Sequence, residues 1–277
     1  MNHTSTVPAA VETLRVPDAL LHYEVRGQGP VVVLVGAPMD ARSFARLADR
    51  LAADHTVLTT DPRGINRSAV DDPDRDSTPQ LRAEDLARLV AHLEAGPALV
   101  LGSSGGAVSA LALVQAHPEL VHTVIAHEPP LIELLDDREQ LLAQTEDIVA
   151  THLSGDVTGS WRKFLAQANI AMPEAVFEVM FGGDRDPQQA ADELHWFAHE
   201  MRPTIRWRPD IAALRDGPTR IVVGIGEESR GQLCDRTSTA LTVALGIEPT
   251  MFPGDHIGFA EDPDAFDTRL RAVIEGN

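Results

Sequence analysis

Short apolar runs alternate with longer amphipathic segments along most of this chain. The runs are rich in valine, isoleucine and threonine, as strands are, whereas the amphipathic segments repeat their apolar residues every three to four positions, as helices do. This alternation predicts an α/β fold: a doubly wound, mostly parallel sheet of eight strands with helices on both faces. The predicted strands are residues 12–16, 20–25, 31–35, 56–60, 98–101, 123–126, 220–223 and 249–252. The predicted helices are residues 41–53, 78–94, 107–116, 232–245 and 263–274.

The alternation stops after Pro129 and Pro130 and resumes near residue 218. The pattern between these points is helical, so residues 131–217 are predicted to form a helical lid or cap, inserted between the sixth and seventh strands. Residues 1–130 and 218–277 then form the core domain. The insert holds all three tryptophans and four of the eight phenylalanines of the chain. A lid needs a small core of its own and must also cover the core domain. These aromatic side chains are therefore expected to line an apolar pocket as well as to form that small core.

Composition narrows the range of partners. The formal net charge of −19 argues against binding to nucleic acid or to anionic membranes, because both need clusters of basic side chains. No apolar run is long enough to cross a bilayer, and the first thirty residues lack the pattern of a signal peptide. The single cysteine, Cys234, suits a reducing compartment. We therefore expect a cytoplasmic protein that acts on a small-molecule substrate, and the sequence leaves its oligomeric state open, a homodimer included.

A glycine-rich pentapeptide at residues 102–106 carries the strongest chemical signal. It reads Gly-Ser-Ser-Gly-Gly and lies between the predicted strand 98–101 and the predicted helix 107–116. A Gly-x-Ser-x-Gly motif between a strand and a helix is typical of a nucleophile elbow, in which a tight turn exposes the central serine. The N–H groups at the start of the following helix point toward any negative charge that develops there. We therefore predict that Ser104, rather than Ser103, is a nucleophile.

A serine hydroxyl needs a base in order to react at neutral pH. Of the 11 histidines, His256 is the candidate because it lies in a glycine-bounded loop, residues 252–259, between the last predicted strand and the last predicted helix. That loop follows a strand, so it should lie at the same edge of the sheet as Ser104, where the carboxyl ends of the parallel strands meet. The chain order of nucleophile, acid and histidine is typical of one class of α/β enzymes.

With these residues in place, the chain resembles the α/β-hydrolase superfamily over nearly its whole length. Residues 33–38 resemble the family's loop after the third strand, residues 61–68 its Asp-x-Arg-Gly-x-Gly-x-Ser loop, and residues 254–256 its histidine loop. The resemblance implies an oxyanion hole formed by the backbone N–H groups of Ala37 and Gly105. It also implies an acidic residue that orients the histidine.

The acidic residue has two candidate positions. The family usually carries it a few residues after the seventh strand, where Glu227 stands in this chain with Glu228 beside it. Some members, including lactonases and haloalkane dehalogenases, carry it after the sixth strand instead, where Glu128 stands. The two prolines that follow Glu128 would hold its carboxylate rigidly, as an orienting group requires. We therefore place Glu128 first and keep Glu227 as the alternative.

Other patterns are weaker. His195 and His199 lie four residues apart on a predicted helix and could face one metal ion, but the motif lacks the glutamate and the third ligand of a zinc site. No phosphate-binding or dinucleotide-binding glycine loop is found in the sequence, so no cofactor and no metal are expected. Cys234 lies in a predicted helix and is interpreted as a packed side chain.

Together these features predict a serine hydrolase that cleaves a carboxylic ester or lactone of a small, fairly apolar molecule through an acyl-enzyme. Serine as the nucleophile argues against dehalogenase and epoxide hydrolase chemistry, which use aspartate in the resembling families. The alternative, from a different class, is a ligand-binding member of the family that keeps the pocket without turnover.

Overall fold

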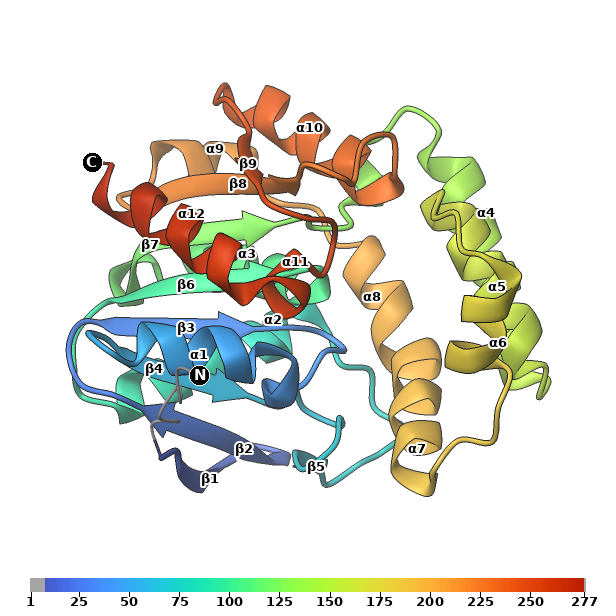
Figure 1. Ribbon diagram of the computed structural model, residues 1–277, viewed down its shortest axis with the longest axis horizontal. Helices are drawn as coiled ribbons and strands as arrows, with labels where there is room; N and C mark the ends of the chain where they lie inside the picture. The colour runs from blue at the N-terminus through green and yellow to red at the C-terminus, as the bar shows by residue number, and fades with distance from the viewer. Residues whose placement is uncertain (1–7, 277) are drawn as a thin grey trace, which may run out of the picture.

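A mostly parallel sheet runs through the centre of the protein in the computed structural model, which describes residues 8–276 (Figure 1). Residues 1–7 and 277 of the predicted core domain lie outside the described residues. In spatial order the strands are β1 (Ala10–Val16), β2 (Ala19–Arg26), β4 (Thr56–Thr60), β3 (Val31–Val35), β6 (Ala98–Ser103), β7 (Val121–His127), β8 (Arg220–Gly226) and β9 (Thr250–Phe252). The pairs β1–β2 and β2–β4 are antiparallel, and all neighbours from β4 to β9 are parallel. The predicted fold class is confirmed.

One strand more than the eight expected is present in the described part of the chain. It is β5 (Ala69–Val70), which pairs antiparallel with the start of β2. Two residues are too few to show the alternation by which a strand is recognised in a sequence. The strand lies between β4 and α2, in a segment for which the sequence predicts neither strand nor helix, and it pairs the middle of that segment with the sheet.

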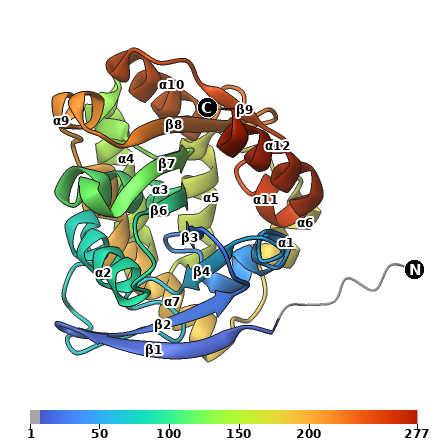
Figure 2. The same ribbon diagram turned by 90° about the vertical axis from the view of Figure 1, so that its left-hand side faces the viewer.

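Helices cover both faces of the sheet (Figure 2). One face is covered by α1 (Ala45–Leu51), α11 (Gly258–Glu261) and α12 (Pro263–Glu275), whose apolar residues share a core cluster with β3, β6 and β7. The other face is covered by α2 (Pro79–His92), α3 (Gly105–Ala116), α9 (Ile211–Asp216) and α10 (Leu233–Leu245). Two faces covered in this way explain why the central strands are continuous apolar runs.

Most predicted helices begin where side-chain caps allow it. Thr78 accepts a hydrogen bond from the N–H of Leu81 at the start of α2, and Asp262 accepts one from the N–H of Ala265 at the start of α12. The predicted helix 41–53 is shorter than expected. Its first turn is the 3₁₀ helix η1 (Ala41–Phe44), capped by Asp40, and only α1 continues as an α-helix.

The segment predicted to be helical contains no strand among its residues, all of which the structure describes. It holds the 3₁₀ helix η3 (Ile132–Leu134), α4 (Arg138–Leu153), α5 (Val157–Ala168), α6 (Glu174–Phe181), α7 (Pro187–His195), the π-helix η4 (Trp196–Glu200) and α8 (Met201–Ile205), followed by α9. A further 3₁₀ helix, η2 (Pro118–Leu120), precedes β7. The helices α4 to α8 lie beyond the carboxyl ends of the parallel strands (Figure 1). Within residues 8–276, no helix combines the length and the apolar character that a membrane span requires.

Candidate active site

Ser104 lies on a sharp turn between β6 and α3. All six residues of β6 are buried, and the chain then passes through Ser104, with a φ of 57° and a ψ of −127°, into the first residue of α3. A left-handed φ at a residue other than glycine is strained, and such strain gathers at functional sites. Ser103, by contrast, is fully buried, with its Oγ 3.3 Å from Nδ1 of His127. The turn therefore directs the hydroxyl of Ser104, and not that of Ser103, toward the pocket described below.

The turn depends on the close approach of α3 to the end of β3. A Cβ atom on Gly106 would lie 2.3 Å from the carbonyl oxygen of Val35, and this neighbour is a backbone atom rather than the end of a flexible side chain. Gly106→Ala is therefore expected to destabilise the protein by roughly 1–3 kcal/mol, measured by urea denaturation. The matched control is Gly183→Ala, since nothing lies within 4 Å of a Cβ atom at Gly183. Equal stability of the two variants would contradict this packing.

The two backbone groups expected to form an oxyanion hole lie next to each other. Ala37 follows the end of β3, and Gly105 begins α3 immediately after Ser104. A Cβ atom on Gly105 would lie only 2.6 Å from the carbonyl oxygen of Ala37. Within the described chain, neither N–H group donates a hydrogen bond to another backbone or side-chain atom. Both groups are therefore free to donate to a ligand in the same pocket.

His256 and Glu128 form a short hydrogen bond. His256 lies in the loop between β9 and α11, and its Nδ1 is 2.6 Å from Oε2 of Glu128. Glu128 follows β7 directly and is 0 % exposed, and its other oxygen, Oε1, accepts a hydrogen bond of 2.8 Å from the N–H of Gly226. Its φ of 52° turns the side chain inward from the end of the strand. Both carboxylate oxygens are thus occupied, and one of them holds the histidine.

The alternative carboxylates lie elsewhere. Glu227 and Glu228 follow β8, and both side chains are exposed. Their backbone N–H groups donate to the carbonyl oxygens of Phe252 and Gly254, so this segment supports the histidine loop through its backbone. Of the three candidate acids, Glu128 is the one that contacts His256.

The histidine and the carboxylate shift each other's pKa. Burial alone would lower the pKa of His256, but the neighbouring Cys234 sulfur and the Glu128 carboxylate raise it well above 6.5. Burial alone would raise the pKa of Glu128, but the hydrogen bond and charge of His256 lower it to about 2. Opposite charges in close contact favour both ionised forms. The carboxylate is therefore ionised at neutral pH.

Cys234 is a neighbour of the histidine that sequence reasoning missed. It lies in the first turn of α10, is half-buried, and lines the same pocket as Ser104 and His256. Its Sγ, a ring nitrogen of His256 and an oxygen of Glu128 all lie within 4.8 Å of one another. In the described part of the chain this is the one group of three residues that could hold a metal ion.

His195 and His199 do not form such a group. The ring of His195 packs on Gly64, where a Cβ atom would lie 2.3 Å from Nε2 of the histidine. The ring of His199 faces Asp76, with 3.4 Å between Nδ1 and Oδ1. These contacts join α7 and η4 to loops of the core domain.

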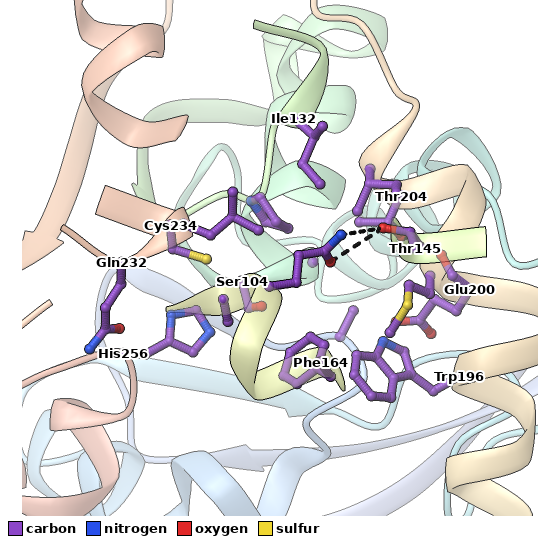
Figure 3. A pocket seen from close by; sticks show the side chains of 18 of the residues that line it. Ser104, Ile132, Thr145, Phe164, Trp196, Glu200, Thr204, Gln232, Cys234 and His256 are labelled. Carbon is purple, nitrogen blue, oxygen red and sulfur yellow. Dashed lines mark hydrogen bonds between the residues drawn. The ribbon is translucent and has the colours of Figure 1, made fainter. Parts of the chain in front are cut away.

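A pocket opens beside Ser104 under the helices of the insert (Figure 3). Its empty volume is about 750 Å³, open solvent at the mouth included. Phe164, Trp196 and Met201 contribute apolar surface from the insert. Trp161 stacks on Trp196 outside this pocket. The aromatic side chains of the insert are expected to line the pocket or a small core of the insert itself. Trp207 does neither, because it packs in the core cluster between the sheet and the helices α2 and α3.

Comparison with known proteins shows the family and the fold of this chain. The model of a family described as the alpha/beta hydrolase family matches residues 31–269. The chain is 32% identical over 278 residues to the uncharacterized hydrolase YraK of Bacillus subtilis, with 95% of each chain covered. It is 26% identical over 270 residues to the zearalenone hydrolase of Bionectria ochroleuca, with 92% of this chain and 94% of that protein covered. A solved hydrolase from Pseudomonas aeruginosa PA01 has the same fold, with a TM-score of 0.71, 19% identity, and 96% and 98% of the two chains covered.

The chain therefore belongs to the alpha/beta hydrolase family. The coarse prediction of a hydrolase is confirmed by these relatives. The bond that is cleaved and the roles of the individual residues stay predictions.

Proposed function

We propose that this protein is a cofactor-free serine hydrolase that cleaves a carboxylic ester or lactone of a small, fairly apolar molecule. The observation that carries the proposal is the 2.6 Å hydrogen bond between Nδ1 of His256 and the buried carboxylate of Glu128, beside the strained turn of Ser104. The mainly apolar pocket above Ser104 supports a neutral substrate. Zearalenone is one candidate, because a relative is named for hydrolysing it.

The geometry supports a two-step reaction. With Nδ1–H donated to Glu128, Nε2 of His256 is left as the base. It takes the proton of the Ser104 hydroxyl while Oγ attacks the carbonyl carbon, and the N–H groups of Ala37 and Gly105 stabilise the negative oxygen. The imidazolium then gives its proton to the leaving alcohol, and an acyl-enzyme forms. Water, activated by the same histidine, releases the acid and restores the serine.

Ser104 and His256 share no hydrogen bond in the described chain, although both line the pocket. Such contacts are often long in free enzymes and shorten when a substrate binds. Side chains of α4, α5, η4 and α8 line the pocket, and we propose that the helices α4 to α8 act as its lid.

Labelling with a fluorophosphonate tests the proposal. The wild-type protein is expected to react at Ser104, as mapped by peptide mass spectrometry, and to hydrolyse p-nitrophenyl acetate, p-nitrophenyl butyrate or zearalenone. Absence of both labelling and hydrolysis would contradict the proposal and favour the ligand-binding alternative. Labelling at a different residue would contradict the role of Ser104.

The pH dependence of the reaction follows from the raised pKa of His256. Because the folded protein favours the imidazolium, the neutral base forms only at higher pH, and kcat/KM is expected to rise through an apparent pKa above 6.5. Hydrolysis rates between about pH 5 and about pH 10 measure this rising limb of the pH profile of kcat/KM. Glu128→Gln should move the limb to lower pH, since the carboxylate charge is lost. A wild-type limb centred below 6.5 would contradict the pairing.

The position of Cys234 predicts sensitivity to thiol reagents. An adduct of N-ethylmaleimide on this side chain would occupy the pocket beside His256, so ester hydrolysis is expected to fall by more than ~90 %. The Cys234→Ser variant, treated in the same way, should lose none of its own activity. Full activity of a wild-type protein that mass spectrometry shows to be completely alkylated would contradict this placement.

A further inference from the structure

The wall of the pocket formed by the insert contains a buried carboxyl group that the proposed reaction does not use. Glu200 is the last residue of the π-helix η4 and is 1 % exposed. It lines the same pocket as Ser104 and His256. In Figure 3 it lies on the opposite side of Ser104 from His256, beside Thr204.

This carboxyl group lacks a hydrogen-bond partner. Its Oε2 is buried and accepts no hydrogen bond from any residue of the described chain. The nearest cation is Arg82, whose Nη1 lies 4.0 Å from Oε2, beyond hydrogen-bond distance. Buried carboxyl groups are normally paired, because each unmet hydrogen bond costs free energy.

Arg82 is held by other groups. Its Nε donates to Ser109 Oγ and its Nη2 to Thr204 Oγ1, each at 2.8 Å, and its Nη1 donates to Ser77. The guanidinium is thus fixed where it is: it faces Glu200 as a counter-charge but donates no hydrogen bond to it.

The other polar side chains of this wall are satisfied. The amide of Gln167 donates to the hydroxyl of Thr145, and Thr204 donates to the carbonyl oxygen of Glu200 itself. Among the residues that line the pocket, all of which lie in the described chain, Glu200 is the one with an orphaned buried polar atom. Oε2 is enclosed on the side of Arg82, whereas the other oxygen, Oε1, also accepts no hydrogen bond within the described chain and is not among the buried atoms. A ligand in the pocket can therefore donate a hydrogen bond to the Oε1 atom of this carboxyl group.

The surroundings restrict the charge of that partner. Arg82 would repel a cation placed next to Glu200, and the rest of the wall is mainly apolar. Burial also raises the pKa of the Glu200 carboxyl, although the charge of Arg82 opposes this. A neutral hydroxyl group fits both conditions, since it donates to a carboxylate and also accepts from a protonated carboxyl.

We propose that Glu200 binds a free hydroxyl group of the substrate, so that the preferred substrates are neutral esters or lactones that carry an alcohol or phenol remote from the scissile carbonyl. This inference rests on the proposed function. It adds a polar recognition point to a pocket that is otherwise apolar, and it makes Glu200 a specificity-determining residue. A site built for a hydroxyl group rejects analogues that lack it more strongly than an apolar pocket rejects a change in size.

The test compares two p-nitrophenyl esters, of 3-(4-hydroxyphenyl)propanoate and of 3-phenylpropanoate. We expect the wild-type protein to favour the hydroxylated ester by at least ~10-fold in kcat/KM, and Glu200→Met to reduce this ratio to within ~3-fold of one. Glu200→Gln, which can still accept and donate, should keep most of the preference. The matched control is Glu139→Met, because Glu139 is an exposed carboxylate on α4, and it should keep the wild-type ratio.

Binding to the Ser104→Ala variant separates this inference from the proposed reaction. Calorimetry should show tighter binding of the hydroxylated ester, and Glu200→Met in the same background should abolish the difference. If Glu200→Met fails to fold because Arg82 is left without a counter-charge, Arg82→Met/Glu200→Met restores the balance of charge. Equal binding of the two esters, or a preference that survives the loss of Glu200, would overturn the inference. Failure of hydrolysis alone, with the binding preference present, would overturn only the proposed function.

Discussion

Ser104→Ala is expected to reduce kcat for ester hydrolysis by about five to six orders of magnitude and to abolish fluorophosphonate labelling. The loss follows because no other hydroxyl group stands on the turn after β6, among the residues described, with its side chain toward the pocket. Steady-state kinetics with p-nitrophenyl butyrate measures the effect. The melting temperature should change little, since the backbone of the turn is kept.

Ser103→Ala is the matched control for this experiment. The side chain of Ser103 is buried and faces His127, so its removal should leave most of the activity in place. If Ser104→Ala kept more than a tenth of the wild-type activity, or if both variants lost activity equally, the role of Ser104 as the nucleophile would be contradicted.

Glu128→Gln is expected to lower kcat by about 10⁴-fold, because an amide can neither stabilise the imidazolium nor hold the correct tautomer of His256. Glu227→Gln and Glu228→Gln should stay within ~2-fold of the wild type, since both side chains are exposed. Kinetics at saturating substrate, with circular dichroism to check the fold, measures the three variants side by side. Similar mild effects in all three would contradict the triad.

The sharp turn at Ser104 could be predicted because its geometry is local. A buried strand, the glycines at 102, 105 and 106, and a helix follow one another directly, so the residue types alone define the turn. The carboxylate that contacts His256 could not be identified in this way. Glu128 and Glu227 both follow neighbouring parallel strands, and both segments approach the histidine loop. Only the left-handed backbone of Glu128 turns its carboxylate inward, and a sequence gives little sign of that.

Cys234 and Glu200 show two different reasons for a missed residue. The start of α10 lies at the pocket because of the path of the loop after β8, which periodicity does not reveal. Glu200 did leave a signal. It follows Trp196 and Phe197 by four and three residues and precedes Met201, so it is a carboxylate within the apolar side of a helical segment. A charge in that position is a reason to look for a partner or a ligand.

The position of Trp207 bears on how this family can diversify. Its side chain, with that of Leu214, is part of the core cluster between the sheet and the helices α2, α3 and α10. The last part of the insert therefore stabilises the core domain. From residue 135 to residue 206, by contrast, the apolar residues pack largely on each other, on α10 and around the pocket, while Leu131 and Leu134 at the start of the insert join Trp207 in the core cluster. We therefore expect that recombination between relatives, in nature or in the laboratory, can exchange that shorter stretch and alter substrate choice while the fold persists. A crossover placed after Trp207 would exchange core packing along with specificity.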